Sequence, residues 1–411
     1  MPNNITISES IDLPINKSIL NRYLILKYLY DDLSNVSLDS GTPDDSILLY
    51  NILKEDIPDF CNCMNAGTVF RFILAVSSLS GKSRIIDGSE RMRERPCKDL
   101  VDSLELLGAK IEYLDKVGYP PVRIISPINL NNYPETIFVK SDISSQFVSA
   151  IMMIAPLLPL GLNIELCEQN VSHSYIVMTS EIMNNVGLKT VFNDNLIYVL
   201  SQTDKVMFDD FIFEKDWSAA AFWVTILSAF EKGSVELKGL TTKSVQGDKV
   251  ILDYLHYLNI DYIENDNSII LSKSGIRIIE KPDKVVKIDL KNSPDLFPPL
   301  AVAFALSDVE VHFTGLNNLI WKESNRIVSV LDNLKLLSYD VVQLSDDDVI
   351  IYRSINDISN INKKIMIKTH DDHRIAMAFA VFEYLNDNIE IDNMDCVTKS
   401  YPGFSVGFLN K

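Results

Sequence analysis

The stretch Asn65–Leu79 reads NAGTVFRFILAVSSL, in which a polar loop with small residues leads into an almost wholly apolar segment. The small residues and Thr68 favour a tight loop at the start of a helix, where free backbone N–H groups can bind an anion. A helix that is apolar on all sides is buried inside its domain. The stretch therefore predicts a buried helix whose first turn opens onto an anion site.

The same pattern, a polar loop followed by an apolar helix candidate, occurs six times along the chain. These helices are expected to begin near Ser18, Thr68, Ser145, Ser218, Asp295 and Asp372, at spacings of 50, 77, 73, 77 and 77 residues. Amphipathic helix candidates form a second series, and they end at Gly108, Gly187, Asn259 and Ser338, which lie 79, 72 and 79 residues apart. Gly and Asn commonly end helices in the left-handed conformation. The two series predict an internal repeat of about 75 residues.

Short β-branched stretches such as SRIIDG, PVRIISP, LNIELCE and SIILSK lie between the helices and are typical of strands. Each repeat is therefore expected to be a β/α unit with one buried and one half-exposed helix. Six such units in 411 residues predict two α/β domains of three units each. The order of strands and helices is mixed and differs from the strict alternation of a TIM barrel.

The chain is strongly acidic, with a formal net charge of −18, and 47% of its residues are hydrophobic. The charge argues against nucleic acid or an anionic membrane as a partner, and the hydrophobic fraction excludes a disordered chain. The N-terminus lacks a signal-peptide pattern, and the longest apolar run, Ala150–Leu162, is too short to span a bilayer. Five cysteines without a CxxC pair indicate a reducing compartment and no zinc site. We expect a cytoplasmic protein.

Arginines gather just after the opening stretch, at Arg91, Arg93 and Arg95, and Arg71 lies about one helical turn behind Thr68. A guanidinium matches the oxygens of a phosphate or carboxylate two at a time. On their own, the three loop arginines are more typical of a solvated basic surface. Beside the Gly-Thr helix start, they favour an anion site.

Other polar side chains at predicted helix starts have both a structural and a functional interpretation. As simple caps, they would only satisfy backbone N–H groups; as a functional group, Asp295 would be a general base in a cleft. No Ser-His-Asp or Cys-His arrangement supports covalent catalysis, and Gly81-Lys82-Ser83 lacks the first glycine of a P-loop. The HxxH of His370 and His373 has no accompanying ligands, which argues against a metal site.

Taken together and in order, the motifs resemble those of the 5-enolpyruvylshikimate-3-phosphate synthase family of enolpyruvyl transferases. The resemblance runs from about Lys17 to Lys399. It rests on Lys17-Ser18 with Asn21-Arg22, Asn65-Ala66-Gly67-Thr68 with Arg71, Arg91–Pro96, Ser144-Ser145-Gln146-Phe147, Gln246-Gly247-Asp248, Pro294-Asp295, Lys322-Glu323 with Arg326, Asp372-His373-Arg374, and Lys399.

The resemblance implies a two-domain inside-out α/β barrel of six βαβαββ units, three per domain, with a cleft between the domains. One domain would span residues 15–213 and lie mainly on the shikimate 3-phosphate side. The other would consist of residues 1–14 and 214–411 and carry Asp295, Glu323 and Lys399.

The activity implied by the resemblance is transfer of the enolpyruvyl group of phosphoenolpyruvate to the 5-hydroxyl of shikimate 3-phosphate, with release of phosphate. The reaction would pass through a tetrahedral ketal, in the biosynthesis of chorismate and aromatic amino acids. Asp295 would take the proton of the hydroxyl and Glu323 would protonate the methylene carbon, with Lys17 and Lys399 as further catalytic residues. The family needs no metal or organic cofactor, and we expect a monomer. The implied substrate-binding residues are Lys17, Ser18, Arg22, Asn65, Gly67, Arg95, Ser144, Ser145, Gln146, Ser172, Tyr175, Asp295, Asn318, Lys322, Arg326, Arg374 and Lys399.

Two alternatives remain at this point. The related UDP-N-acetylglucosamine enolpyruvyl transferases share the fold and the donor, but many of them carry a cysteine where this chain has Glu90. A repeat scaffold that only binds partners is the other alternative, although a scaffold needs no buried charges. Phe72 stands where many members of the synthase family have proline, which leaves sensitivity to the inhibitor glyphosate open.

Overall fold

The computed structural model describes residues 6–31, 33–140, 144–166, 172–202, 206–209, 211–275, 285–352, 358 and 361–405, and Cys167 lies outside these ranges. The chain divides into two compact units. The terminal unit comprises Met1–Asn16, Ser40–Pro43 and Glu214–Lys411, and the inserted unit comprises Lys17–Asp39 and Asp44–Phe213. Ile15 pairs with Lys215, and the Asn16 N–H donates to the Glu214 carbonyl at 2.9 Å. These contacts place Ile15 and Asn16 in the terminal unit.

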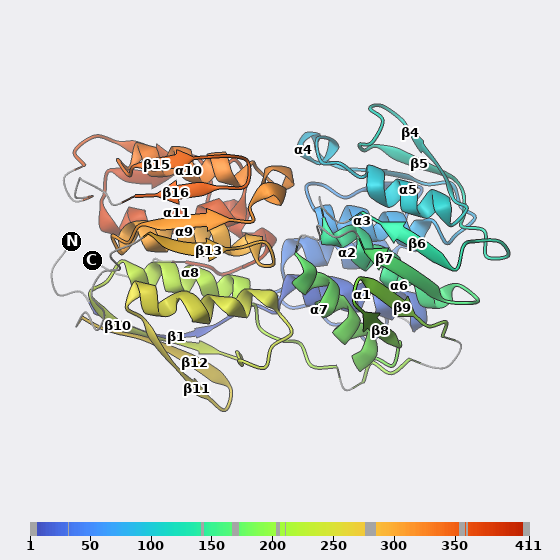
Figure 1. Ribbon diagram of the computed structural model, residues 1–411, viewed down its shortest axis with the longest axis horizontal. Helices are drawn as coiled ribbons and strands as arrows, with labels where there is room; N and C mark the ends of the chain where they lie inside the picture. Colours follow the sequence, from blue (N-terminus) through green and yellow to red (C-terminus); the bar gives the residue numbers. More distant parts are fainter. Residues whose placement is uncertain are drawn as a thin grey trace. The chain divides into compact units, whose positions relative to one another are not determined.

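Helices and short strands alternate through the inserted unit (Figure 1). They are α1 (Lys17–Tyr30), α2 (Asp44–Lys54), β2 (Phe60–Asn62), α3 (Gly67–Ser77), β3 (Ile85–Asp87), α4 (Glu90–Arg93), α5 (Lys98–Leu106), β4 (Lys110–Tyr113), β5 (Val122–Ser126), β6 (Thr136–Val139), α6 (Ser145–Ile154), η1 (Ala155–Leu157), β7 (Leu162–Leu166), α7 (His173–Asn185), β8 (Thr190–Asn193) and β9 (Leu196–Val199).

The terminal unit has the same kinds of element, with more 3-10 helix. They are β1 (Thr6–Asp12), α8 (Trp217–Ser228), β10 (Lys232–Lys238), η2 (Gly247–Leu258), β11 (Asp261–Asn265), β12 (Ser268–Ser274), β13 (Val286–Asp289), η3 (Pro294–Leu296), α9 (Phe297–Leu306), β14 (Val311–Thr314), η4 (Asn317–Trp321), α10 (Arg326–Leu336), β15 (Val341–Gln343), β16 (Val349–Ile351), β17 (Ile365–Ile367), α11 (His373–Leu385), β18 (Ile389–Ile391) and η6 (Asp395–Lys399).

Four sheets in the described ranges share one topology. In the orders β2-β3-β5-β4, β6-β7-β9-β8, β1-β10-β12-β11 and β13-β14-β16-β15, the first two strands are parallel and the last two form an antiparallel hairpin. Each is a βαβαββ unit. A fifth repeat contributes only the parallel pair of β17 and β18, and α1 and α2 form the sixth without a sheet of their own among the described residues. The two-unit α/β class is confirmed, with four repeats complete.

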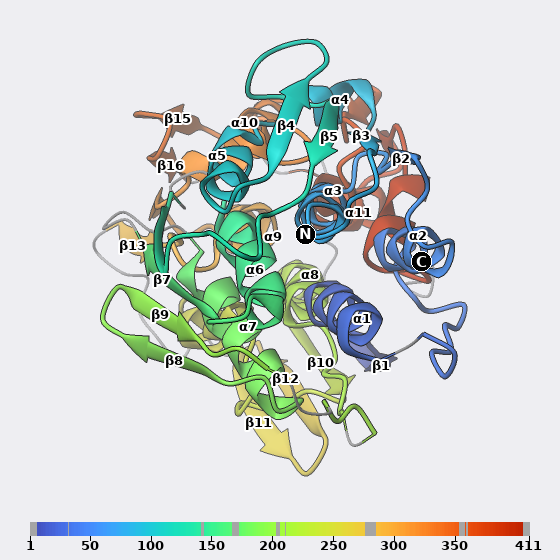
Figure 2. The same ribbon diagram turned by 90° about the vertical axis from the view of Figure 1, so that its right-hand side faces the viewer.

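The predicted apolar helices form the core of each unit. In the inserted unit α1, α3 and α6 contact one another, and in the terminal unit α8, α9 and α11 do so. Every residue of α8 and α9 is buried. Figure 1 shows α8, α9 and α11 between the sheet of β10 and β12 and the sheet of β15 and β16, and Figure 2 shows α1, α3 and α6 together in the inserted unit. The sheets therefore lie outside the helices, as burial of all-apolar helices requires.

The ends of the second helix series are also confirmed. Gly108, Gly187, Asn259 and Ser338 have φ values of +96°, +96°, +57° and +69°, the left-handed conformation that ends a helix. The amphipathic helix predicted to end at Asn259 is the 3-10 helix η2 (Gly247–Leu258).

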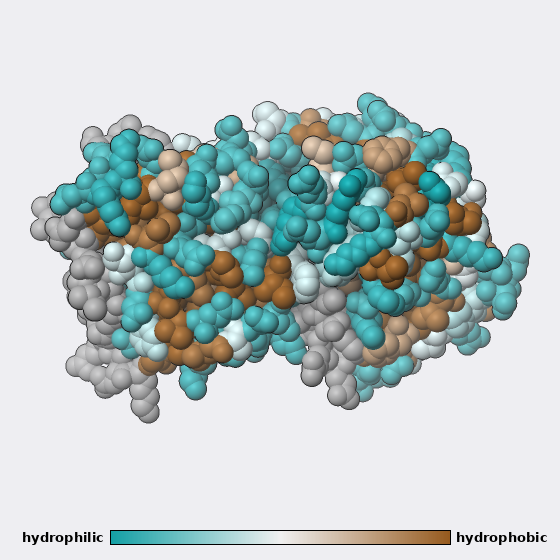
Figure 3. Space-filling view, turned by 90° about the horizontal axis from the view of Figure 1, so that it is seen from above, coloured by the Kyte–Doolittle hydropathy of each residue, from teal (hydrophilic) through white to brown (hydrophobic). Residues whose placement is uncertain are grey.

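On the face seen in Figure 3, hydrophilic side chains surround smaller groups of hydrophobic ones on each unit. No helix within the described ranges has the length and apolarity needed to cross a bilayer.

Candidate active site

Arg22 projects from α1 into the interior of the inserted unit and is only 1% exposed. Its guanidinium donates to neutral oxygens: Nε to Thr179 Oγ1 at 2.7 Å, Nη1 to the Ser18 carbonyl at 2.9 Å and Nη2 to Ser149 Oγ at 3.0 Å. Burial lowers the pKa of Arg22 to about 10, with Tyr175 acting in the opposite direction, so the group is charged at neutral pH. A buried cation held by neutral oxygens is well suited to accept an anion.

Gly67 opens α3 directly against two guanidinium groups. A Cβ at this position would lie 2.3 Å from Arg95 Nη2 and 2.6 Å from Arg71 Nη1, so these two nitrogens are at most about 4.9 Å apart. Arg71 and Arg95 are 2% and 3% exposed. An anion between two buried cations this close relieves their mutual repulsion.

Gln146 connects this pair to the next helix. Its side-chain oxygen accepts from Arg71 Nη1 at 2.6 Å and its amide donates to Thr68 Oγ1 at 3.0 Å. The Asn65 carbonyl accepts from Arg95 Nη1 at 3.2 Å. Arg71 and Thr68 thus join the residues implied by the resemblance, and the sequence signal for both is their position one to four residues after Gly67.

Hydroxyl groups lie at the starts of α6 and α7, which pack against each other. Ser144 caps α6 through the Gln146 N–H, and Ser145 is buried as its first residue. Ser172 precedes α7 in a left-handed conformation, and the Tyr175 carbonyl lies 3.4 Å from Arg22 Nη2. The structure thus gathers Ser18, Arg22 and Tyr175 in one group and Asn65, Gly67, Arg95 and Gln146 in another.

Lys17 begins α1 and forms an ion pair with Asp45 Oδ2 of α2 at 2.9 Å. The two side chains are 13% and 10% exposed. Asp45 belongs to none of the motifs, so sequence alone does not identify it as a partner of Lys17.

Arg91 and Arg93, expected to help to form the anion site, have carboxylate partners in this structure. Arg91 Nη1 pairs with Glu94 at 2.7 Å, and Arg93 forms two bonds with Asp87 at the end of β3. Arg91 and Glu94 are both partly exposed, whereas Asp87 is buried beside the exposed Arg93. Arg95 is the loop arginine whose guanidinium lies directly against Gly67.

Arg326, the first residue of α10, organises the charges of the terminal unit. Nη1 binds Asp295 Oδ1 and Nη2 binds Glu323 Oε2, both at 2.7 Å, while Nε binds Asp372 Oδ2 at 2.8 Å. Burial alone would lower the pKa of Arg326, but the three carboxylates outweigh it and raise the pKa. Two carboxylates suited to proton transfer are thus held on one guanidinium.

Three further cations complete this cluster. Lys322 Nζ and Arg374 Nη2 lie 3.2 and 3.0 Å from the two oxygens of Asp295, and Lys399 Nζ lies 3.4 Å from Glu323 Oε1. Burial would raise the pKa of Asp295, but Arg374, Lys322 and Arg326 outweigh it and hold the pKa well below its usual range. Four cations thus surround three carboxylates here, and an anionic ligand can bind to Lys322, Arg374 and Lys399 at the edge of the cluster.

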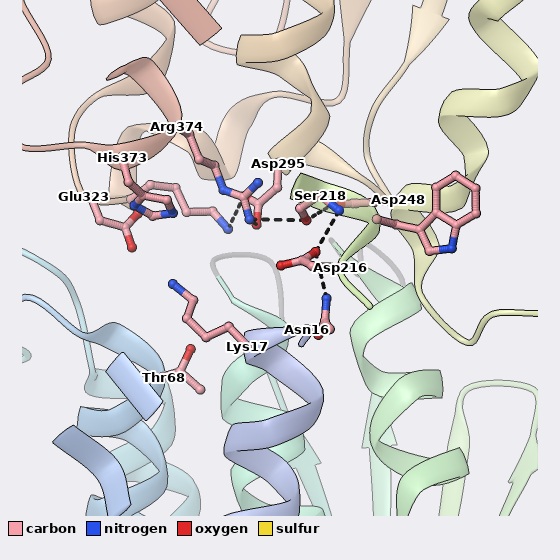
Figure 4. Close-up of polar contacts among 12 residues, drawn as sticks. Asn16, Lys17, Thr68, Asp216, Ser218, Asp248, Asp295, Glu323, His373 and Arg374 are labelled. Atoms are coloured by element: carbon pink, nitrogen blue, oxygen red, sulfur yellow. Dashed lines mark hydrogen bonds and ion pairs between the residues drawn. The ribbon is translucent and has the colours of Figure 1, made fainter. Parts of the chain in front are cut away.

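The helix starts themselves meet within each unit. In the terminal unit, Arg374 of α11 reaches both Ser218 of α8 and Asp295 before α9, as Figure 4 shows. In the inserted unit, Gln146 of α6 reaches Thr68 of α3. Asn318 lies buried in η4, which leads to Lys322. The positive ends of the helix dipoles thus add to the charge of the side chains.

Gln246 connects two of the points at which the chain passes between the units, near Asn16 and near Glu214. Its side-chain oxygen accepts from Asn16 Nδ2 at 2.7 Å and from the Trp217 N–H at 2.9 Å. Its amide donates to Glu214 Oε2 at 2.9 Å and to the Lys215 carbonyl at 2.7 Å. All of its hydrogen-bonding capacity is satisfied.

Two α/β units, each with buried cations at the starts of its central helices, define a protein that binds small, multiply charged anions. In the described ranges, no three or more His, Cys, Asp or Glu side chains gather as a metal site. Residues 46–406 match the family described as EPSP synthase (3-phosphoshikimate 1-carboxyvinyltransferase), and the chain belongs to this family.

Individual relatives agree with this assignment. A 3-phosphoshikimate 1-carboxyvinyltransferase of Bacteroides fragilis is 35% identical over 404 residues, covering 97% of this chain and 94% of the relative. A protein of the same name from Methanospirillum hungatei is 32% identical over 346 residues, covering 84% and 77%. The solved structure of EPSP synthase from Acinetobacter baumannii has a TM-score of 0.69 at 20% identity, covering 98% of this chain and 95% of that one, and supports the fold.

Proposed function

We propose that this chain transfers the enolpyruvyl group of phosphoenolpyruvate to the 5-hydroxyl of shikimate 3-phosphate and releases phosphate. The observation that carries the proposal is the arrangement of Asp295 and Glu323 on one guanidinium, each 2.7 Å from Arg326. Addition to a vinyl group needs one group that accepts the hydroxyl proton and another that protonates the methylene carbon. Two carboxylates among four cations can supply both groups and also hold the anionic donor.

The inserted unit supplies the groups for shikimate 3-phosphate. Arg22 and the hydroxyls of Ser18, Ser144, Ser145, Ser172 and Tyr175 combine one buried positive charge with several neutral hydrogen-bonding groups. Such a set suits a molecule that carries both a phosphate and hydroxyl groups. Lys17 would contact both substrates.

Phosphoenolpyruvate would be held by Gly67, Arg95 and Gln146 together with Arg326, Arg374 and Lys399; Asn65, Asn318 and Lys322 would support these contacts. When its carboxylate and phosphate bind to Arg326, Arg374 and Lys322, these three cations stabilise the negative charge of Asp295 less. The pKa of Asp295 then rises from its depressed value, which makes the carboxylate a better base. Binding of phosphoenolpyruvate would therefore make Asp295 a better acceptor for the hydroxyl proton.

Glu323 takes up a proton from solvent and donates it to the methylene carbon, while the hydroxyl oxygen attacks the neighbouring carbon and its proton passes to Asp295. The resulting ketal returns a methyl proton to the Glu323 carboxylate and expels phosphate, which restores the double bond in the product. Lys17 and Lys399 stabilise negative charge on the phosphate as it leaves. Since one chain carries every proposed residue, we propose that it acts as a monomer; the free thiols of Cys61, Cys63, Cys97 and Cys396 favour the cytoplasm.

Phosphate release tests the proposal. Purified protein is incubated with phosphoenolpyruvate and either shikimate 3-phosphate, UDP-N-acetylglucosamine or no acceptor. We expect phosphate only with shikimate 3-phosphate. Release only with the nucleotide sugar would indicate that the chain is a UDP-N-acetylglucosamine enolpyruvyl transferase instead. No release with either acceptor would support the scaffold alternative.

A further inference from the structure

Asp248, in the first turn of η2, is a buried carboxyl group next to the charge cluster of the terminal unit. It is 3% exposed. Oδ2 accepts a short hydrogen bond from Ser218 Oγ, and Oδ1 is buried without a hydrogen-bond partner among the described residues. A buried carboxylate with an unpartnered oxygen is costly, and stability alone would favour a neutral side chain here.

Ser218 connects Asp248 to the site. Its hydroxyl donates to Asp248 and accepts from Arg374 Nη2 at 3.4 Å. The same nitrogen lies 3.0 Å from Asp295 Oδ2. Asp248, Ser218, Arg374 and Asp295 therefore form one chain of contacts within the terminal unit, drawn in Figure 4.

We propose that Asp248 is a positioning residue for Arg374. Its carboxylate fixes the direction of the Ser218 hydroxyl, so that the lone pairs of Ser218 Oγ face Arg374. The guanidinium is then held in the place where it binds the phosphoenolpyruvate anion. This inference rests on the proposed function, because its readout is the affinity for that substrate.

The protonation state of Asp248 should control how well this positioning works. Burial raises the pKa of Asp248 to about 6; Asp295 and Asp216 also raise it, while Arg374 and the Ser218 hydrogen bond lower it. Above this pH the carboxylate can only accept from Ser218. Once protonated, it can donate to Ser218 instead, and the hydroxyl no longer faces Arg374 in a single orientation.

The test measures kcat and KM for phosphoenolpyruvate between pH 5 and pH 8 in wild type, Asp248→Asn and Asp253→Asn. Loss of one hydrogen bond to a charged group corresponds to about a tenfold change. We expect the KM of Asp248→Asn to be about tenfold above wild type at pH 8 and close to it at pH 5, where wild-type Asp248 is itself protonated. We expect kcat to stay within about twofold, since the substitution acts on binding. Ionisation of the substrate is the same for both proteins and cancels in the ratio of the two KM values.

Asp253→Asn is the matched control, because it removes an exposed carboxylate from the same 3-10 helix. Its KM should equal that of wild type at every pH. A KM ratio for Asp248→Asn that is one at pH 8, or that is raised equally at all pH values, would overturn the proposal, since a structural defect does not follow this titration. An inactive wild type would instead refute the proposed function.

Ser218→Ala tests the same chain of contacts while retaining the carboxylate, and it keeps the test valid if Asp248→Asn does not fold. We expect about a tenfold higher KM at pH 8 with little change in kcat. The KM of the double variant should be no higher than that of either single variant, because both substitutions break the same connection from Asp248 through Ser218 to Arg374. A folded Ser218→Ala protein with the wild-type KM, or losses that multiply in the double variant, would contradict the proposal.

Discussion

Replacement of Gly67 by alanine should weaken phosphoenolpyruvate binding without unfolding the protein. The added Cβ would lie 2.3 Å from Arg95 Nη2 and 2.6 Å from Arg71 Nη1, whereas real Cβ contacts are not shorter than 3.0 Å. Arg95 Nη2 must therefore move by at least about 0.7 Å. Both contacts involve the ends of flexible side chains, so the guanidinium groups can move while the backbone of α3 stays in place.

The size of the effect follows from this displacement. A shift of about 1 Å in a positioning group can lower the rate roughly a hundredfold. Loss of one hydrogen bond to a charged group can weaken binding by about tenfold or more. We expect kcat/KM for phosphoenolpyruvate to fall by about 10- to 100-fold, or about 1.4 to 2.7 kcal/mol, chiefly through KM. The KM for shikimate 3-phosphate should change by less than about threefold, because Arg22 and its hydroxyl partners are not displaced.

Steady-state phosphate release with each substrate varied in turn measures both constants, and thermal unfolding checks the fold. Gly81→Ala is the matched control, because a Cβ at Gly81 meets nothing within 4 Å. Its kinetics should be those of wild type. If Gly67→Ala bound phosphoenolpyruvate as tightly as Gly81→Ala, the argument that Arg71 and Arg95 bind this anion would be refuted.

Three further predictions concern the charged residues. Glu323→Gln should lower kcat by about a hundredfold or more with little change in KM, since it removes a proton donor and keeps the shape; an unchanged kcat would exclude the acid role. Lys17→Met should abolish phosphate release and keep the fold by circular dichroism, with the exposed-pair variant Lys98→Met as an active control; activity in Lys17→Met would disprove its role. For Asp248, the folded-state pKa of about 6 lies above the usual 3.8, so its stabilising effect is present below pH 3.8 and is lost as pH rises through 6. The stability of Asp248→Asn relative to wild type, from urea unfolding, should therefore increase by about 2 kcal/mol between pH 4 and pH 8, and a difference independent of pH would contradict this pKa.

The repeat was predictable because buried helices and left-handed helix ends leave local signals. The segments that begin at Thr68, Ser218 and Asp295 are apolar on every face, which only a central helix permits. Gly108 and Asn259 ended their helices where expected, with positive φ. The incomplete repeats were less predictable, since short strands such as β17 and β18 differ little in composition from the surrounding loops.

The site was predictable only in part, because side-chain partners far apart in sequence leave no local pattern. Arg93 lies only two residues before Arg95, yet it pairs with Asp87, whereas Arg95 lies against Gly67. Asp248 was known only as part of a motif, and its importance depends on Ser218, which is 30 residues away. Likewise, the depressed pKa of Asp295 results from Arg374 of α11, Lys322 in the loop after η4 and Arg326 of α10.

The most direct test of the account is the mass of the product formed in deuterium oxide. If Glu323 protonates the methylene carbon and a methyl proton is later lost, the product from unlabelled substrates must carry deuterium on its vinyl group. We predict the carboxyvinyl ether of shikimate 3-phosphate with deuterium at that position, together with one phosphate per product. The same carboxyvinyl product without deuterium on its vinyl carbon would contradict addition and elimination, and no carboxyvinyl product at all would contradict the assigned function.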